Sequence, residues 1–141
     1  MKRIWLVVPV LLAAVLFSGA SRASIVKEIR FAGGKSSAVI KQSVIRGEND
    51  QYFLAAKAGQ KMDVEITALE KNAAVTIYRP GYKAGKDSDG VLEVQGATLT
   101  GAGEGEDATG WKGVLPESGR YLILVGPTRG NATYRLKVVI F

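Results

Sequence analysis

Alternation of apolar and polar residues is the feature that most constrains how this chain folds. Tyr121, Ile123 and Val125 recur at every second position, and the segment that ends at Phe141 repeats the pattern. Successive side chains of a β-strand point to opposite sides, so a period of two places these apolar residues on one face of a strand. The sequence therefore predicts strands that bury one face and expose the other.

Nine segments have strand character, and turn residues separate them. Gly, Pro, Asn and Asp gather between the segments, as they do where strands reverse direction. We predict an all-β protein, a single antiparallel β-sandwich (jelly-roll-like) of about eight or nine strands. The interval 80–110 is expected to be a long exposed connection that holds one short strand. The predicted strands are residues 25–31, 38–45, 51–57, 62–67, 75–79, 91–94, 111–115, 121–125 and 134–141.

Residues 1–23 have the composition of a signal peptide. A basic start precedes apolar residues 4–17, and small residues follow at 21–23 where a signal peptidase would cut. The alternative is an uncleaved membrane anchor, but an apolar stretch of this length falls short of the roughly 20 residues that span a bilayer. We predict cleavage after Ala23 and a mature β-sandwich domain at 24–141, periplasmic or secreted, with no stable membrane insertion.

The charge of the mature chain is modest. The full chain has 19 Lys and Arg against 13 Asp and Glu, but Lys2, Arg3 and Arg22 would leave with the signal peptide. The remaining balance, 16 against 13, is +3. The basic residues are scattered, without a run or an aromatic-rich stripe, so the sequence predicts no nucleic-acid partner.

Missing residue types exclude several kinds of chemistry. The chain has no His and no Cys, which removes the usual general base, the usual zinc ligands, thiol catalysis and disulfides. We therefore predict a protein that is not an enzyme and that needs no cofactor or metal. The acidic residues Glu104, Glu106 and Asp107 are interpreted as a solvated loop, and the Asp87–Gly90 tetrad as an Asx-stabilised turn in preference to a Ca²⁺ loop.

Three stretches of the chain resemble a known family. They are RFAGGKSSA at 30–38, YFLAAKAGQKMDVEI at 52–66 and LPESGRYLILV at 115–125. In these stretches the chain is similar to the periplasmic inhibitors of g-type lysozyme of Gram-negative bacteria, within the broader bacterial pre-peptidase C-terminal-like β-sandwich domains. The resemblance covers most of the mature chain and is poorest at 80–110.

The resemblance implies an inhibitory surface. Its Ser-Gly-x-Tyr type element would be Ser118, Gly119 and Tyr121, with Arg120 beside the tip and Arg129 in a second contact turn. An Arg in such a turn can bind a cleft carboxylate through two hydrogen bonds. The phase of the strand allows a different role for the tyrosine, in the core of the sandwich.

Two functions follow as hypotheses from these observations. In the first, an exported lysozyme-inhibitor-like protein blocks an enzyme cleft with its surface turns, and the resemblance points to a g-type lysozyme as the enzyme. In the alternative, a non-catalytic module binds polysaccharide or another cell-envelope partner, for which Tyr82 and Trp111 are the aromatic candidates. Where the inhibitors are expected to carry an aromatic residue in a turn, this chain has Glu48-Asn49-Asp50, so an aromatic anchor would be missing there.

Overall fold

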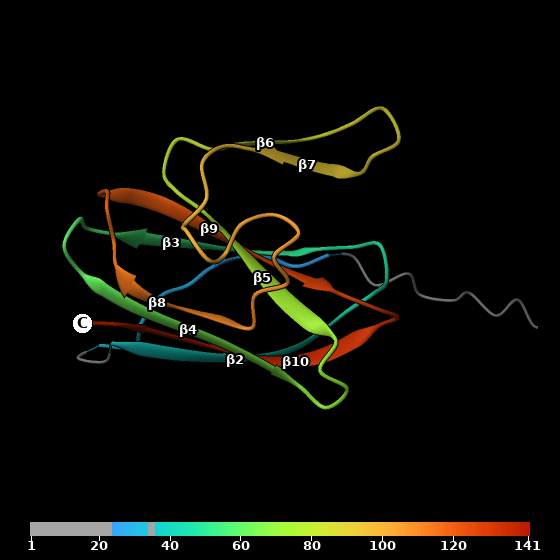
Figure 1. Ribbon diagram of the computed structural model, residues 1–141, viewed down its shortest axis with the longest axis horizontal. Coiled ribbons are helices and arrows are strands. Elements are labelled where there is room, and N and C mark those ends of the chain that lie inside the picture. The colour runs from blue at the N-terminus through green and yellow to red at the C-terminus, as the bar shows by residue number, and fades with distance from the viewer. Residues whose placement is uncertain (1–23, 34–35) are drawn as a thin grey trace, which may run out of the picture.

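The protein is built from β-strands. The computed structural model (Figure 1) describes residues 24–33 and 36–141, and within these ranges it contains no helix. The predicted signal peptide at 1–23 lies outside the described residues. The strands are β1 (Val26–Glu28), β2 (Ser37–Val44), β3 (Asp50–Ala56), β4 (Lys61–Ala68), β5 (Ala73–Tyr78), β6 (Lys83–Lys86), β7 (Leu92–Gln95), β8 (Gly110–Val114), β9 (Gly119–Pro127) and β10 (Ala132–Ile140).

Eight of these strands form two sheets that face each other. One sheet has the order β1-β3-β9-β5 and the other the order β2-β10-β4-β8. All pairs in the two sheets are antiparallel except β1 with β3, which is parallel. The predicted antiparallel sandwich is confirmed, with β6 and β7 as a separate hairpin outside it (Figure 1).

The core lies between the sheets and follows the alternation in the sequence. Tyr121, Ile123 and Val125 are fully buried on β9, and Leu136 and Val138 are fully buried on β10. The intervening residues of β10 are exposed at most positions. Burying such a side chain contributes about 1.5–3 kcal/mol, so the two-residue period sets which face of each strand turns inward.

The interval 80–110 is more ordered than the sequence indicated. It contains two strands where one was expected, because Lys83–Lys86 pairs with Leu92–Gln95. The Lys-Ala-Gly-Lys strand has no apolar alternation, and only its backbone pairing with β7 makes it a strand. The prediction of an exposed connection was wrong for residues 97–108, since Leu99 and Ala102 are buried in the core.

Residues 97–108 cover the free edge of β5. The backbone N–H groups of Val75 and Ile77 donate to the carbonyls of Ala108 and Ala102, at 2.8 and 2.9 Å. A sheet edge left unpaired would be a template for aggregation. The long loop therefore has a structural role at this edge.

Candidate functional site

The candidate residues divide between two opposite ends of the sandwich. The turns at 57–60 and 115–118 form one end, which we call the Ser118 end, and the turns at 45–49, 69–72 and 128–131 form the other, the Arg129 end (Figure 1). β9 joins the two and has nine residues, which at about 3.3 Å per residue spans about 30 Å. The two predicted inhibitory turns are therefore separate surfaces.

At the Ser118 end, the polar groups bind within the protein. The Ser118 Oγ accepts a hydrogen bond from the Ala58 N–H at 2.9 Å, which ties the two turns together. Tyr121 is 0% exposed. Its hydroxyl donates to the Glu117 carbonyl at 2.7 Å and accepts from the Glu117 N–H at 3.2 Å. Tyr121 thus occupies the core position that the strand phase allowed, and its hydroxyl fixes the turn.

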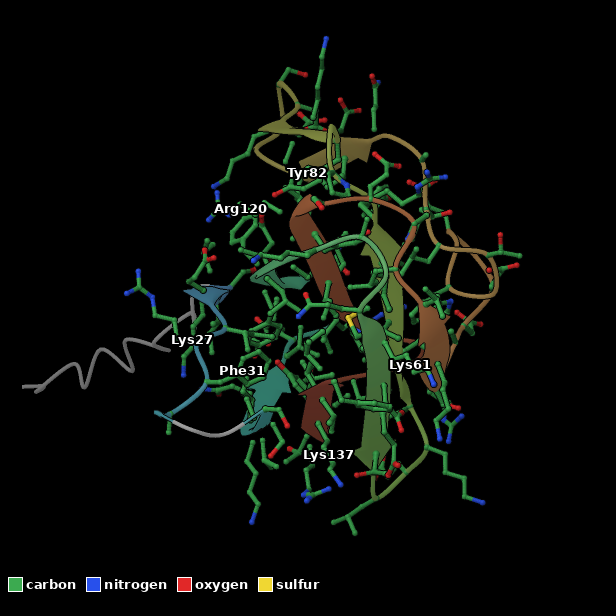
Figure 2. The ribbon with its side chains drawn as sticks, turned by 90° about the vertical axis from the view of Figure 1, so that its left-hand side faces the viewer. Lys27, Phe31, Lys61, Tyr82, Arg120 and Lys137 are labelled. Atoms are coloured by element: carbon green, nitrogen blue, oxygen red, sulfur yellow. The ribbon has the colours of Figure 1, made fainter. Side chains whose placement is uncertain are left out.

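Gly119 and Arg120, which lie between Ser118 and Tyr121, also make contacts within the protein. Gly119 has a φ of +145°, and a Cβ there would lie 2.8 Å from Pro80 Cβ, so only glycine fits. The Arg120 guanidinium donates to Glu28 at 2.7 Å and stacks over the Phe53 ring, 3.9 Å from its centroid. Arg120 therefore lies on the outer face of the β1-β3-β9-β5 sheet (Figure 2), where cation–π contact and an ion pair hold it.

At the Arg129 end, two neighbouring turns are locked together. Asn72 is 2% exposed, and its side-chain amide donates to the carbonyls of Arg129 and Asn131 at 3.0 and 2.9 Å. The Thr128 N–H donates to the Asn72 carbonyl at 2.8 Å, and the Arg129 guanidinium donates to the Glu70 carbonyl. These bonds fix the backbone of the 128–131 turn, while the Arg129 side chain stays exposed.

Arg46 brings a second guanidinium to the same end. Its backbone N–H donates to the Asn131 side-chain oxygen at 2.9 Å, and both Arg46 and Arg129 line one open hollow of about 440 Å³ with Pro127, Thr128 and Gly130. In the described part of the chain, no carboxylate forms an ion pair with either arginine. Sequence reasoning missed Arg46, because 85 positions separate it from Asn131 and only the sheet pairing brings them together.

A buried chain of hydrogen bonds lies in the core next to this end. The Tyr134 hydroxyl donates to Asp50 Oδ2 at 2.6 Å, and Asp50 Oδ1 accepts from the Ile25 N–H at 2.9 Å. The hydroxyl of Tyr52 lies within hydrogen-bonding distance of the Tyr134 hydroxyl. Burial raises the pKa of both tyrosines above the ordinary value, and the Asp50 contact raises that of Tyr134 further. Both hydroxyls therefore stay protonated and hold the loop that carries Arg46.

The aromatic candidates for sugar stacking have partners of their own. The Trp111 indole N–H donates to the Thr100 carbonyl at 3.0 Å, and its ring packs against the core. Tyr82 stacks on Phe53, with centroids 6.3 Å apart. Neither ring stands free on the surface as a platform for a sugar.

The acidic residues of the long interval act as structural groups. Asp87 Oδ1 accepts from the N–H groups of Asp89 and Val91, both at 2.9 Å, which is the Asx turn expected from the sequence. Glu104 accepts from the Tyr78 hydroxyl. These carboxylates stabilise their own loops and do not face one another across a cleft.

The two ends differ in what they offer a partner. The Ser118 end presents groups already used within the protein. The Arg129 end presents two exposed guanidinium groups that have no carboxylate partner among the described residues, on turns that are tied in place. A guanidinium is the side chain best suited to bidentate recognition of a carboxylate. The fold and these loops define a β-sandwich that presents two exposed arginines at one end, on turns joined by hydrogen bonds.

Solved structures with the same fold place the chain in a family. The sequence is 31% identical to that of Aeromonas hydrophila PliG, a periplasmic lysozyme inhibitor of g-type lysozyme. The crystal structure of that protein matches with a TM-score of 0.63 and covers 84% of this chain and 98% of its own. A PliG mutant from Escherichia coli (23% identity, TM-score 0.59, 84% and 100% covered) and Salmonella Typhimurium PliG (22%, 0.57, 85% and 100%) share the fold. No protein-family model matches the chain, and no curated protein matches it significantly by sequence.

The chain belongs to the PliG family of periplasmic lysozyme inhibitors. The resemblance to the inhibitors of g-type lysozyme predicted from the sequence is confirmed. Among the residues that the structure describes, no helix is long and apolar enough to cross a membrane.

Proposed function

We propose that this protein inhibits g-type lysozyme by placing the 128–131 turn in the substrate cleft of the enzyme. Arg129, supported by Arg46, would bind a carboxylate there. The observation that carries this proposal is the pair of exposed guanidinium groups that line one hollow on locked turns. Family membership supports the choice of enzyme, because its Aeromonas member is an inhibitor of g-type lysozyme.

The chemistry of glycoside hydrolysis explains why arginine suits this role. Most such enzymes act with carboxylic side chains that flank the bond to be cleaved. A guanidinium that reaches one of them forms two charge-assisted hydrogen bonds in a site that excludes water. The Asn72 amide already holds the turn, so binding would cost little loss of backbone freedom.

The residues at 48–50 fit an arginine-based contact. Asp50 is buried, and Asn49 packs so closely on Gly126 that a Cβ there would lie 2.5 Å from Asn49 Oδ1. This loop therefore contributes Arg46 to the basic end in place of an aromatic anchor. The inhibitor would depend on charge more than on an inserted ring, so salt should weaken the complex.

The Ser118 end remains the alternative inhibitory surface. Ser118, Gly119 and Arg120 would have to exchange their internal contacts for contacts with the enzyme, and Tyr121 would act only by fixing the turn. We favour the Arg129 end because its two guanidinium groups are exposed and, among the described residues, form no ion pair. Arg129 would exchange only its bond to the Glu70 carbonyl. Substitutions at the two ends separate these possibilities.

The rival function is a non-catalytic module that binds envelope polysaccharide. It would require a stacking surface, and the best aromatic candidates, Tyr82 and Trp111, are half-buried against other side chains. The absence of His and Cys supports a protein that binds and does not catalyse. We expect no nucleic-acid partner and no cofactor.

Export is part of the proposal. The protein is periplasmic or secreted, as its family indicates, and we propose that cleavage after Ala23 produces a mature chain that begins at Ser24. N-terminal sequencing of protein released by osmotic shock tests this step. An intact Met1 on the released protein would contradict it.

A lysis assay tests the function itself. The mature protein is added to g-type, c-type and i-type lysozymes acting on peptidoglycan, and the inhibition constant is measured for each. We expect tight inhibition of the g-type enzyme and little effect on the other two. If the protein does not slow lysis by the g-type enzyme, the proposal is refuted.

A further inference from the structure

The outer face of the β2-β10-β4-β8 sheet carries a cluster of cations at the pairing of β2 with β10. Arg135 on β10 lies directly opposite Lys41 on β2, and Lys137 follows two residues further along the same face. All three are exposed, and within the described ranges none of them forms an ion pair. Figure 2 shows Lys137 on the opposite side of the molecule from Tyr82 and Arg120.

Two like charges opposite each other on adjacent strands destabilise the pairing. On its other neighbour, β4, Arg135 faces Thr67, while Lys137 faces Glu65. The Lys41–Arg135 pair is therefore the part of the cluster with no acid directly opposite it. A serine–threonine pair follows in the same row, where Ser43 and Thr133 share a hydrogen bond of 2.9 Å. Cations and hydroxyl groups in this arrangement suit an external anion such as a phosphate.

A fully exposed leucine stands beside this cluster. Leu69, in the turn after β4, is 99% exposed. It lines a shallow hollow of about 500 Å³ with Lys41, Arg135, Thr67 and Thr133. An isolated leucine on a surface is unremarkable, but this one borders a basic, hydroxyl-bearing face.

The turn that carries Leu69 is held outward. The Lys71 N–H donates to the Ala68 carbonyl at 3.0 Å and closes the turn, and the Arg129 guanidinium donates to Glu70. Leu69 therefore cannot fold back onto the sandwich without breaking these bonds. Its apolar side chain is therefore available to an apolar environment outside the protein.

We propose that this face docks the protein reversibly on an anionic phospholipid bilayer, with Leu69 entering the interface and Lys41 and Arg135 contacting lipid phosphates. A bilayer fits better than a protein partner, because the hollow beside Leu69 is shallow and open. Basic residues next to one apolar side chain are the combination that gives weak interfacial binding. No segment would span the membrane.

The charge distribution sets the orientation. The β6–β7 hairpin lies across the molecule from Lys137 (Figure 2) and carries Lys83 and Lys86 against Asp87, Asp89 and Glu93. This side is nearly balanced in charge, so an anionic bilayer would attract the basic face more strongly. The hairpin would then point away from the lipid.

Vesicle sedimentation of the mature protein tests this inference. Binding is measured on vesicles of phosphatidylglycerol with phosphatidylcholine and on phosphatidylcholine alone, and we expect binding only to the first, lost at high salt. K41E/R135E should weaken binding by about 25-fold or more, at about fivefold per cation removed. L69D should weaken it by about tenfold.

The matched controls change the hairpin on the other side. K83E and V91D make the same kinds of substitution at exposed positions and should bind vesicles like the parent. Equal binding by the parent and K41E/R135E, no binding to either vesicle, or release by inorganic phosphate at constant ionic strength would overturn the proposal. Inhibition of g-type lysozyme is measured in parallel for the same variants. Failure of vesicle binding can then be distinguished from failure of lysozyme inhibition.

Discussion

At one end of β9 the Ser118–Gly119 turn directs its polar groups into the protein, whereas at the other end the 128–131 turn leaves Arg129 in solvent. Both turns contain a glycine with positive φ and precede a strand. The difference lies in their neighbours. Ser118 accepts from the Ala58 N–H. Asn72 donates to the carbonyls of the second turn, and the Arg129 side chain stays exposed, with its guanidinium bonded to the Glu70 carbonyl. Similar local sequences thus acquire different roles from tertiary contacts.

Both ends of β9 depend on one shared core, and a substitution at the centre of that core should lower the free energy of unfolding most. Val138 is fully buried, so V138D would bury an unpaired carboxylate and destabilise the fold by about 4 kcal/mol or more. K137D, on the exposed face of the same strand, puts a carboxylate opposite Glu65 and should cost about 1 kcal/mol or less. Chemical denaturation measures both, and equal losses would mean that the faces of β10 are misassigned.

Glycine substitutions should separate the two ends by stability. G119A would place its Cβ 2.8 Å from Pro80 at a φ that disfavours side chains, and we expect a loss of about 2–3 kcal/mol. G130A has a φ of +58° and open space around its Cβ, so we expect about 1 kcal/mol. If both cost the same in thermal unfolding, the packing of the Ser118 end is looser than described.

Substitution of Tyr121 separates a structural role of its hydroxyl from a role in lysozyme contact. Y121F removes the hydroxyl that bridges the N–H and carbonyl of Glu117, which should lower stability by about 1–2 kcal/mol. Inhibition of g-type lysozyme should be unchanged at a temperature where the variant is folded. Unchanged melting together with lost inhibition would instead assign Tyr121 to the contact surface.

The sequence predicted most of the fold because alternation is a local signal. The strands of the sandwich follow from it, as does the burial of Tyr121 and Val138. β6 was missed because Lys83–Lys86 carries no alternation and forms only by pairing with β7. The covered edge of β5 was missed for the same reason, since backbone pairing leaves no pattern in the side chains.

The site was less predictable because it depends on contacts between distant segments. Arg129 could be proposed from its turn, but its neighbour Arg46 is brought close by the pairing of β2 with β10. The separation of the two predicted turns follows from the continuous run of β9. Neither fact is visible in the residues of the turns themselves.

Inhibition by paired variants, one from each end of β9, tests the central claim most directly. R129A should weaken the complex with g-type lysozyme by about 2–5 kcal/mol, mainly through faster dissociation, and leave the melting temperature unchanged. S118A should inhibit like the parent, apart from a small loss of stability. Full inhibition by R129A together with lost inhibition by S118A would contradict the account and move the inhibitory surface to the Ser118 end.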